Sequence, residues 1–246
     1  MTPLPAAAGV AVASYLIGSI PFAYIIVKAA TGEDVTEHGT GNVGSMNVRR
    51  ATGSWGLFAV AVLGDGLKGL VPVALAKWLA QLPVLVPYSQ GVVMALHRAV
   101  TSLPDPTMST GWLFLLANPL PLLAVFGCVA GHNYSLWMAL IEHKFARTGK
   151  GLATGAGALL AYDWRYFAVA LAVGLVVIAV TRYMMAGQVA AAFALPVAAL
   201  AMRSFDWPFA LFMGVLVYSA HHARFIGMLQ GKEPKLYVND SMGPRG

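Results

Sequence analysis

The chain has 246 residues, of which 58% are hydrophobic and only 11% are charged, and its mean hydropathy is +0.69. Soluble domains carry about 25% charged residues, so this composition excludes an ordinary soluble domain and predicts an all-α integral membrane protein in a lipid bilayer. The formal charge of +6 lies beside the apolar segments, as membrane topology requires, and we expect no nucleic acid partner. The single Cys128 lies in an apolar run, so no disulfide framework is expected.

About seven apolar segments are expected to cross the bilayer as helices. Residues 6–29 have no basic region of a signal peptide before them, so they predict a retained first helix, which is notched at residues 18–21. The other segments are residues 54–80, 114–141, 152–162, 166–180, 186–202 and 208–218. Residues 152–162 are too short to span in full, which predicts a half-helix or a short tilted helix.

The chain is interpreted as a single domain over residues 1–246. Residues 83–113 are broken by prolines and charges and predict an extramembrane insertion. A polar tail is expected to begin near His221, and residues 229–246 are its polar end.

The number of crossings decides which loops share a membrane face. Seven crossings place residues 31–53, residues 142–151, Arg182 and the tail together. This face gathers the basic residues Arg49, Arg50, Lys144, Arg147, Lys150, Arg182, Arg224, Lys232 and Lys235. Because basic loops favour the cytoplasm, we expect an outside N-terminus and a cytoplasmic C-terminus. The protein is then a multi-pass protein of the cytoplasmic membrane, with its site facing the cytoplasm.

A polar, glycine-rich loop covers residues 36–53. Three glycines within six residues, Gly39, Gly41 and Gly44, allow backbone N–H groups to form a concave anion-binding nest. Hydroxyl, amide and guanidinium groups supply the further donors that a phosphate needs. These donors belong to Thr40, Asn42, Ser45, Asn47, Arg49 and Arg50. A flexible surface loop has the same composition, so the pattern alone leaves both interpretations open.

A second basic loop, residues 142–151, ends in Thr148-Gly149-Lys150-Gly151 immediately before an apolar helix. A helix N-terminus beside a lysine is suited to bind an anion. The spacing is not that of a Walker A loop, and no strand precedes it. The alternative is that the lysine only follows the positive-inside rule.

Ionisable residues within the apolar segments are functional candidates, because burying charge in a membrane is costly. Asp65 and Lys68 are three residues apart on one predicted helix, so they can pair with each other or contact a ligand. His132 is predicted at a similar depth. His221 and Arg224 follow the last span, where they can cap it or line the same pocket.

Several catalytic patterns are missing from the sequence. It contains no His-x-x-x-x-Asp pair, no Gly-x-Ser-x-Gly elbow and no His-Glu-x-x-His. His38 and His143 have no carboxylate partner at metal-site spacing, which argues against zinc, and neither a metal nor a cofactor is expected. The inventory predicts a site that positions anions and stabilises charge without its own nucleophile.

Five stretches, taken in order, resemble the PlsY-type bacterial acyl-phosphate:glycerol-3-phosphate acyltransferases. They are the Gly-Ser-Ile-Pro-Phe of residues 18–22, the glycine loop of residues 39–50, the Asp-x-x-Lys-Gly-x-x-Pro of residues 65–72, Gly131-His132, and residues 149–154. Several motifs in the right order are a far more specific signal than one glycine loop.

The resemblance implies a seven-helix fold and transfer of an acyl group from acyl phosphate to the 1-hydroxyl of glycerol 3-phosphate. Its products would be lysophosphatidic acid and phosphate, in phospholipid synthesis, without a cofactor; we expect a monomer. It also implies that the catalytic, phosphate-binding residues are Thr40, Arg50, Lys150 and His221. The residues that would shape or line the substrate site are Gly39, Gly41, Asn42, Gly44, Ser45, Asn47, Asp65, Lys68, His132, Arg147, Gly149, Gly151 and Arg224.

Some positions depart from the family pattern. Met46 replaces a threonine, Ser135 a proline and Arg224 an asparagine, while Arg147-Thr148 stands where the family has Lys-Gly. These changes affect the expected acceptor more than the reaction class. The alternatives are a membrane transporter of an organic phosphate, although no internal repeat is found, and a catalytically weak paralogue that acts on another acceptor.

Overall fold

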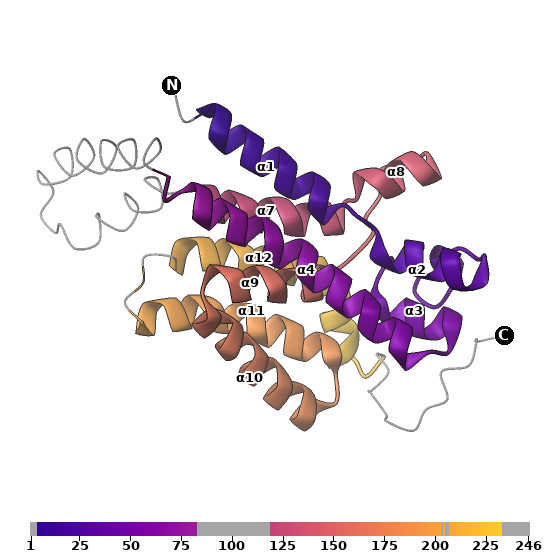
Figure 1. Ribbon diagram of the computed structural model, residues 1–246. Helices are drawn as coiled ribbons and strands as arrows, with labels where there is room; N and C mark the ends of the chain where they lie inside the picture. Colours follow the sequence, from indigo (N-terminus) through magenta and orange to yellow (C-terminus); the bar gives the residue numbers. More distant parts are fainter. Residues whose placement is uncertain (1–3, 83–118, 203, 205–206, 233–246) are drawn as a thin grey trace, which may run out of the picture. The chain divides into compact units, whose positions relative to one another are not determined.

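The computed structural model describes residues 4–82, 119–202, 204 and 207–232 (Figure 1). All regular elements within these ranges are helices. They form two compact units, which we describe separately. The first contains the described parts of Met1–Gln81 and Leu120–Tyr162, and the second contains the described part of Asp163–Asp240.

The first unit carries the glycine loop, the basic loop and the buried charges. Its elements are α1 (Leu4–Gly18), α2 (Phe22–Thr31), the 3-10 turn η1 (Val35–Glu37), α3 (Ser45–Thr52), α4 (Trp55–Leu79), α7 (Leu120–Asn133), α8 (Leu136–Glu142) and α9 (Leu152–Tyr162). The elements that the structure describes in the second unit are α10 (Trp164–Thr181), α11 (Met184–Ala201) and α12 (Trp207–Leu229).

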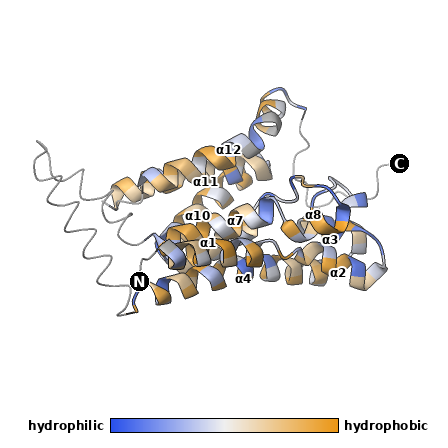
Figure 2. Ribbon diagram, turned by 90° about the horizontal axis from the view of Figure 1, so that it is seen from above, coloured by the Kyte–Doolittle hydropathy of each residue, from blue (hydrophilic) through white to orange (hydrophobic). Residues whose placement is uncertain are grey.

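Five helical stretches are long and apolar enough to cross a membrane within the described part of the chain. They are Pro5–Thr31, Trp55–Leu79, Leu120–Glu142, Trp164–Thr181 and Met184–Ala201. Leu152–Tyr162 and Trp207–Ser219 are apolar but shorter. Figure 2 shows that hydrophobic residues cover most of the length of the helices. The prediction of an all-α membrane protein is confirmed, whereas a count of seven spans remains a prediction.

Two of the expected spans are interrupted. The predicted notch at residues 18–21 is confirmed, because α1 ends at Gly18 and α2 begins at Phe22 after Pro21. The span expected over residues 114–141 is supported where the structure describes it, by the stretch Leu120–Glu142, but it contains a break that was not predicted. There α7 ends at Asn133, and α8 begins at Leu136 with a new direction (Figure 1). Ser135 starts this second helix by accepting a hydrogen bond from the Met138 backbone N–H at 3.1 Å.

Small residues bring the helices of the first unit close together. Helix α1 packs along α7, and α4 packs along α9. A Cβ atom at Gly18 would overlap the backbone of Cys128, and one at Gly157 would overlap the backbone of Gly66. Such close approach is the usual packing mode of membrane helices, since lipid supplies no hydrophobic force between them.

In the second unit, α11 packs against both α10 and α12. The prediction that a polar tail begins at His221 is wrong, because α12 continues as a helix to Leu229. Its apolar residues keep helical spacing past the predicted end. For example, the Tyr218 and Phe225 rings, two turns apart, lie 6.0 Å from each other on one face.

The predicted insertion at residues 83–113 lies outside the described residues, as do residues 233–246 of the predicted tail. The interpretation of the chain as one domain stays a prediction.

Gly157→Ala is expected to destabilise the protein, because the new methyl group would meet the backbone of Gly66, which cannot move aside cheaply. Overpacking costs about 1–3 kcal/mol, which exceeds the gain of about 1 kcal/mol in helix propensity. Gly155→Ala, on the same helix with open space around it, is the control. Thermal unfolding in detergent should show a lower midpoint for Gly157→Ala alone; equal midpoints would contradict this packing.

Candidate active site

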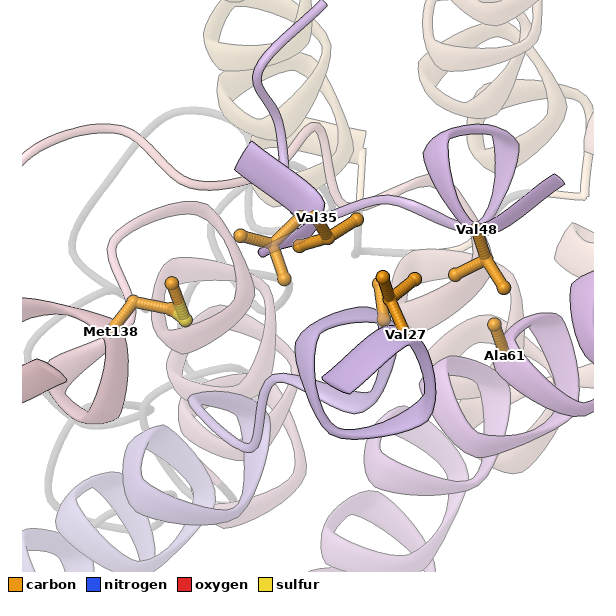
Figure 3. Close-up of a cluster of buried hydrophobic side chains, with 7 residues drawn as sticks. Val27, Val35, Val48, Ala61 and Met138 are labelled. Atoms are coloured by element: carbon orange, nitrogen blue, oxygen red, sulfur yellow. The ribbon is translucent and has the colours of Figure 1, made fainter. Parts of the chain in front are cut away.

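The glycine loop is anchored at both ends by buried valines. Val35 in η1 and Val48 in α3 are fully buried. Figure 3 shows them in one cluster with Val27 of α2, Ala61 of α4 and Met138 of α8. Burying a valine stabilises a fold by about 1.5–3 kcal/mol, so the polar residues between the two anchors are held in place.

Asn47 is the centre of hydrogen bonding within the loop. Its side chain is 0% exposed. Its Nδ2 donates to the Asn42 carbonyl at 2.8 Å, and its Oδ1 accepts from Arg50 Nη1 at 2.6 Å and from the Thr40 backbone N–H at 3.4 Å. Asn47 therefore connects three of the predicted substrate-binding residues. This placement explains why a polar residue occupies a fully buried position in α3.

Two glycines of the loop have conformations that other residues rarely adopt. Gly39 has a φ angle of 57° and Gly41 one of 69°. A Cβ atom at Gly39 would also lie 2.5 Å from Cδ of Arg50. Positive φ angles of this kind turn successive N–H groups toward one side, as in an anion-binding nest. Thr40, between the two glycines, donates from its hydroxyl to Asn42 Oδ1 at 2.9 Å.

The glycine loop and the basic loop are joined by a backbone hydrogen bond. The N–H of Val43 donates to the carbonyl of Thr148 at 2.7 Å. The sequence predicted only that the two loops lie on the same membrane face. This contact places Val43, the neighbour of Gly44, against Thr148, which is two residues from Lys150 and adjacent to Arg147.

The basic loop lies against His132. A Cβ atom at Gly149 would overlap the imidazole ring, and Arg147 Nε donates to the Gly149 carbonyl at 3.1 Å. Gly151, with a φ angle of 73°, turns the chain into α9. Lys150 is thus held between a glycine that packs on His132 and a glycine that starts a helix.

A buried group of charged residues lies on α4 and α7. Asp65 Oδ1 is 2.8 Å from Lys68 Nζ, and each side chain is 3% exposed, which confirms the predicted pair. His132 Nδ1 is 3.7 Å from the same carboxylate oxygen, as its predicted depth required. Lys68 Nζ also donates to the Ile20 carbonyl at 2.7 Å, in the break between α1 and α2. The pair and a backbone carbonyl therefore compensate much of the cost of burial.

Thr154 is a residue that sequence reasoning did not single out. It is fully buried on α9, and its hydroxyl has no hydrogen-bond partner within the described part of the chain. The available signal was its place at the end of the matching stretch of residues 149–154.

The remaining predicted residues are placed as follows. Ser45 begins α3 directly after Gly44. His221 is buried on α12 in the second unit, so it is described apart from the residues above. The side chain of Arg224 lies outside the described residues.

The fold and the site define an integral membrane protein with two joined glycine loops, each carrying a cation, next to a buried charged group. The chain belongs to the glycerol-3-phosphate acyltransferase family, because the sequence model of that family matches residues 8–231. It is 34% identical to the glycerol-3-phosphate acyltransferase of Thermosynechococcus vestitus, over 92% of this chain and 93% of the relative. The corresponding protein of Clostridioides difficile is 32% identical, over 92% and 94%.

The fold is also that of a solved membrane protein. The crystal structure of PlsY (YgiH), an integral membrane glycerol 3-phosphate acyltransferase, in its glycerol 3-phosphate form, has a TM-score of 0.66 to this chain. The match covers 95% of this chain and 96% of the other at 23% identity.

Asp65→Asn is expected to destabilise the protein by about 3 kcal/mol, because it leaves the buried ammonium of Lys68 without its counter-charge. Asp163→Asn is the control, since its partner Arg165 is 56% exposed and exposed pairs contribute about 0–1 kcal/mol. Asparagine also retains the cap at the start of α10. Thermal unfolding in detergent compares the two variants. A similar small loss for both would contradict the structural importance of the buried pair.

Proposed function

We propose that the protein transfers an acyl group from acyl phosphate to the 1-hydroxyl of glycerol 3-phosphate. The products are lysophosphatidic acid, for phospholipid synthesis, and inorganic phosphate. The hydrogen bond between Val43 and Thr148 supports this function most directly. It joins two glycine loops with cationic residues into one site, and both substrates carry phosphate.

The reaction requires the protein mainly to position the two substrates. Acyl phosphate is a mixed anhydride and is already activated. The acceptor hydroxyl oxygen bonds to the acyl carbon, the bond from that carbon to the phosphate oxygen breaks, and phosphate leaves with the electron pair. The hydroxyl proton passes to the departing phosphate. Positioning and stabilisation of the developing charge then supply the rate enhancement.

Each loop contributes to this stabilisation. Arg50, oriented by Asn47, and the N–H groups around Gly39 and Gly41 bind phosphate oxygens from one side. Lys150, at the start of α9, binds them from the other. Thr40 completes the phosphate ligands that the first unit supplies, and the buried group of Asp65, Lys68 and His132 shapes the remaining lining. Roles for His221 and Arg224, which belong to the second unit, stay predictions from the sequence.

The membrane arrangement belongs to the same proposal. The two shorter apolar helices, Leu152–Tyr162 and Trp207–Ser219, also cross the bilayer and bring the number of spans to seven. The N-terminus is outside, and the C-terminus and both loops face the cytoplasm, where the soluble acceptor is available. The protein works as a monomer in the cytoplasmic membrane.

The activity is tested with purified protein in detergent, given acyl phosphate and labelled glycerol 3-phosphate. Formation of labelled lysophosphatidic acid is expected. Binding of glycerol 3-phosphate without product would contradict the proposal. It would favour a carrier of organic phosphate or a paralogue that uses another acceptor, and uptake by proteoliposomes would separate these two.

Lys150→Ala and Arg50→Ala are each expected to lower kcat/KM at least tenfold, or by about 1.4 kcal/mol of transition-state stabilisation, because each removes a cation from one loop. Lys144→Ala, in the same loop as Lys150 and exposed, and Lys28→Ala, whose ammonium caps α2, are the controls. Steady-state assays on the folded proteins measure the change. Near-normal turnover in either site variant would refute its role.

Seven crossings with an outside N-terminus place Arg165 outside and Glu37 inside. Arg165→Cys should therefore react with a membrane-impermeant maleimide in intact spheroplasts, whereas Glu37→Cys should react only after permeabilisation. The wild-type protein is the control, because its Cys128 is buried. Protection of Arg165→Cys in intact spheroplasts would mean that Leu152–Tyr162 does not cross.

A further inference from the structure

Thr148 makes more hydrogen bonds to other segments than a loop residue needs for its own conformation. Its N–H donates to the Asn133 carbonyl at 2.8 Å, and its hydroxyl donates to the His132 carbonyl at 2.9 Å. The same hydroxyl accepts from the Ser135 N–H at 3.2 Å. Its carbonyl accepts the Val43 N–H that joins the two loops. One residue thus connects the end of α7, the start of α8 and the glycine loop.

These bonds satisfy groups that a helix break leaves unpaired. The last carbonyls of α7 and the first N–H groups of α8 have no partner within their own helices. Thr148 donates hydrogen bonds to two of those carbonyls and accepts one from one of those N–H groups. Ser135 supplies the rest of the junction: its hydroxyl accepts from the Met138 N–H and donates to the carbonyl of Ser19.

The bond between Thr148 and Ser135 needs a hydroxyl on one residue and an N–H on the other. Glycine has no hydroxyl and proline has no N–H, so glycine at position 148 or proline at position 135 would remove this bond. The φ angle of Ser135 is −71°, which suits proline. The proline ring, however, would place Cδ where the Ser135 N–H now points at the Thr148 hydroxyl. The two residues are therefore matched to each other.

We propose that Thr148 and Ser135 form a clip that positions the phosphate site, with Thr148 as a positioning residue for Lys150 and His132. The proposal rests on the function proposed above and adds how this chain holds that site. Lys150 is two residues from Thr148, and Gly149 between them packs on the imidazole of His132. A shift of Thr148 therefore moves the lysine, the histidine contact and the bond to the glycine loop together.

The hydroxyl is tested first. Thr148→Ser keeps it and should stay within twofold of the wild-type kcat/KM. Thr148→Val keeps the size but loses the hydroxyl, and should lose at least fivefold through a higher KM for one of the two phosphate substrates. Thermal unfolding of the same proteins is measured in parallel. A Thr148→Val protein with a lower unfolding midpoint and an unchanged KM has lost only a structural contact, which would overturn the positioning role.

The match between the two residues is tested with a double-mutant cycle of Thr148→Gly and Ser135→Pro. Of the three variants in the cycle, Ser135→Pro alone should have the lowest kcat/KM, because the proline ring meets the Thr148 hydroxyl. Adding Thr148→Gly makes room and should restore kcat/KM at least fivefold. Ser135→Ala, which removes only the hydroxyl, reports the loss of that group. If the loss of kcat/KM in the double variant equals the product of the losses in the two single variants, the clip is overturned.

The same proteins separate failure of this proposal from failure of the proposed function. Kd for glycerol 3-phosphate is measured by calorimetry alongside activity. A wild-type protein that binds but forms no product refutes the function, and the valine, serine and double variants then decide the clip from Kd. A wild-type protein that neither binds nor reacts overturns both.

Discussion

The structure depends on one constraint: a break in a membrane helix leaves backbone carbonyls without partners in their own helix, so donors from elsewhere in the protein satisfy them. The first unit has two such breaks. In the break between α1 and α2, the ammonium of Lys68 donates to the carbonyl of Ile20 and the hydroxyl of Ser135 to that of Ser19. In the break between α7 and α8, Thr148 takes the carbonyls of His132 and Asn133. The donors that repair the helices are also residues of the site or their direct neighbours.

This sharing explains why polar groups are tolerated so deep in an apolar chain. Lys68 reaches a carbonyl and the carboxylate of Asp65 at once, so its charge is paired and hydrogen-bonded. His132 then lies beside a compensated pair rather than an isolated charge. The cationic residues Arg50 and Lys150 lie on the two loops, and in the function proposed above the loops, rather than the buried pair, bind the phosphates.

The departures from the family pattern do not all have the same meaning. Thr148 and Ser135 lie in contact, and together they form the junction between α7 and α8. Met46, on the first turn of α3, has no such partner among the described contacts, and the structure gives no reason for it. Met46 therefore remains the position of the glycine loop at which a change of acceptor would first be sought.

Much of the candidate site follows from the sequence because its determinants are local. Residues three apart on a helix face the same way, which is enough to predict the pair of Asp65 and Lys68. Closely spaced glycines predict the tight turns at Gly39 and Gly41, and a proline after a glycine and a serine predicts the break before Phe22. Composition alone indicates the membrane and the all-helical fold.

Only the tertiary structure decided which distant groups meet. The bond between Val43 and Thr148 joins residues about a hundred positions apart, and nothing in either loop encodes its partner. The break at Ser135 was not predicted because no proline stands there, and apolar residues on both sides of it favour a helix. The extension of α12 past His221 was hidden because polar residues there resemble a tail. Local propensity fixes turns and periodicity, but hydrogen bonds between segments depend on how the helices pack.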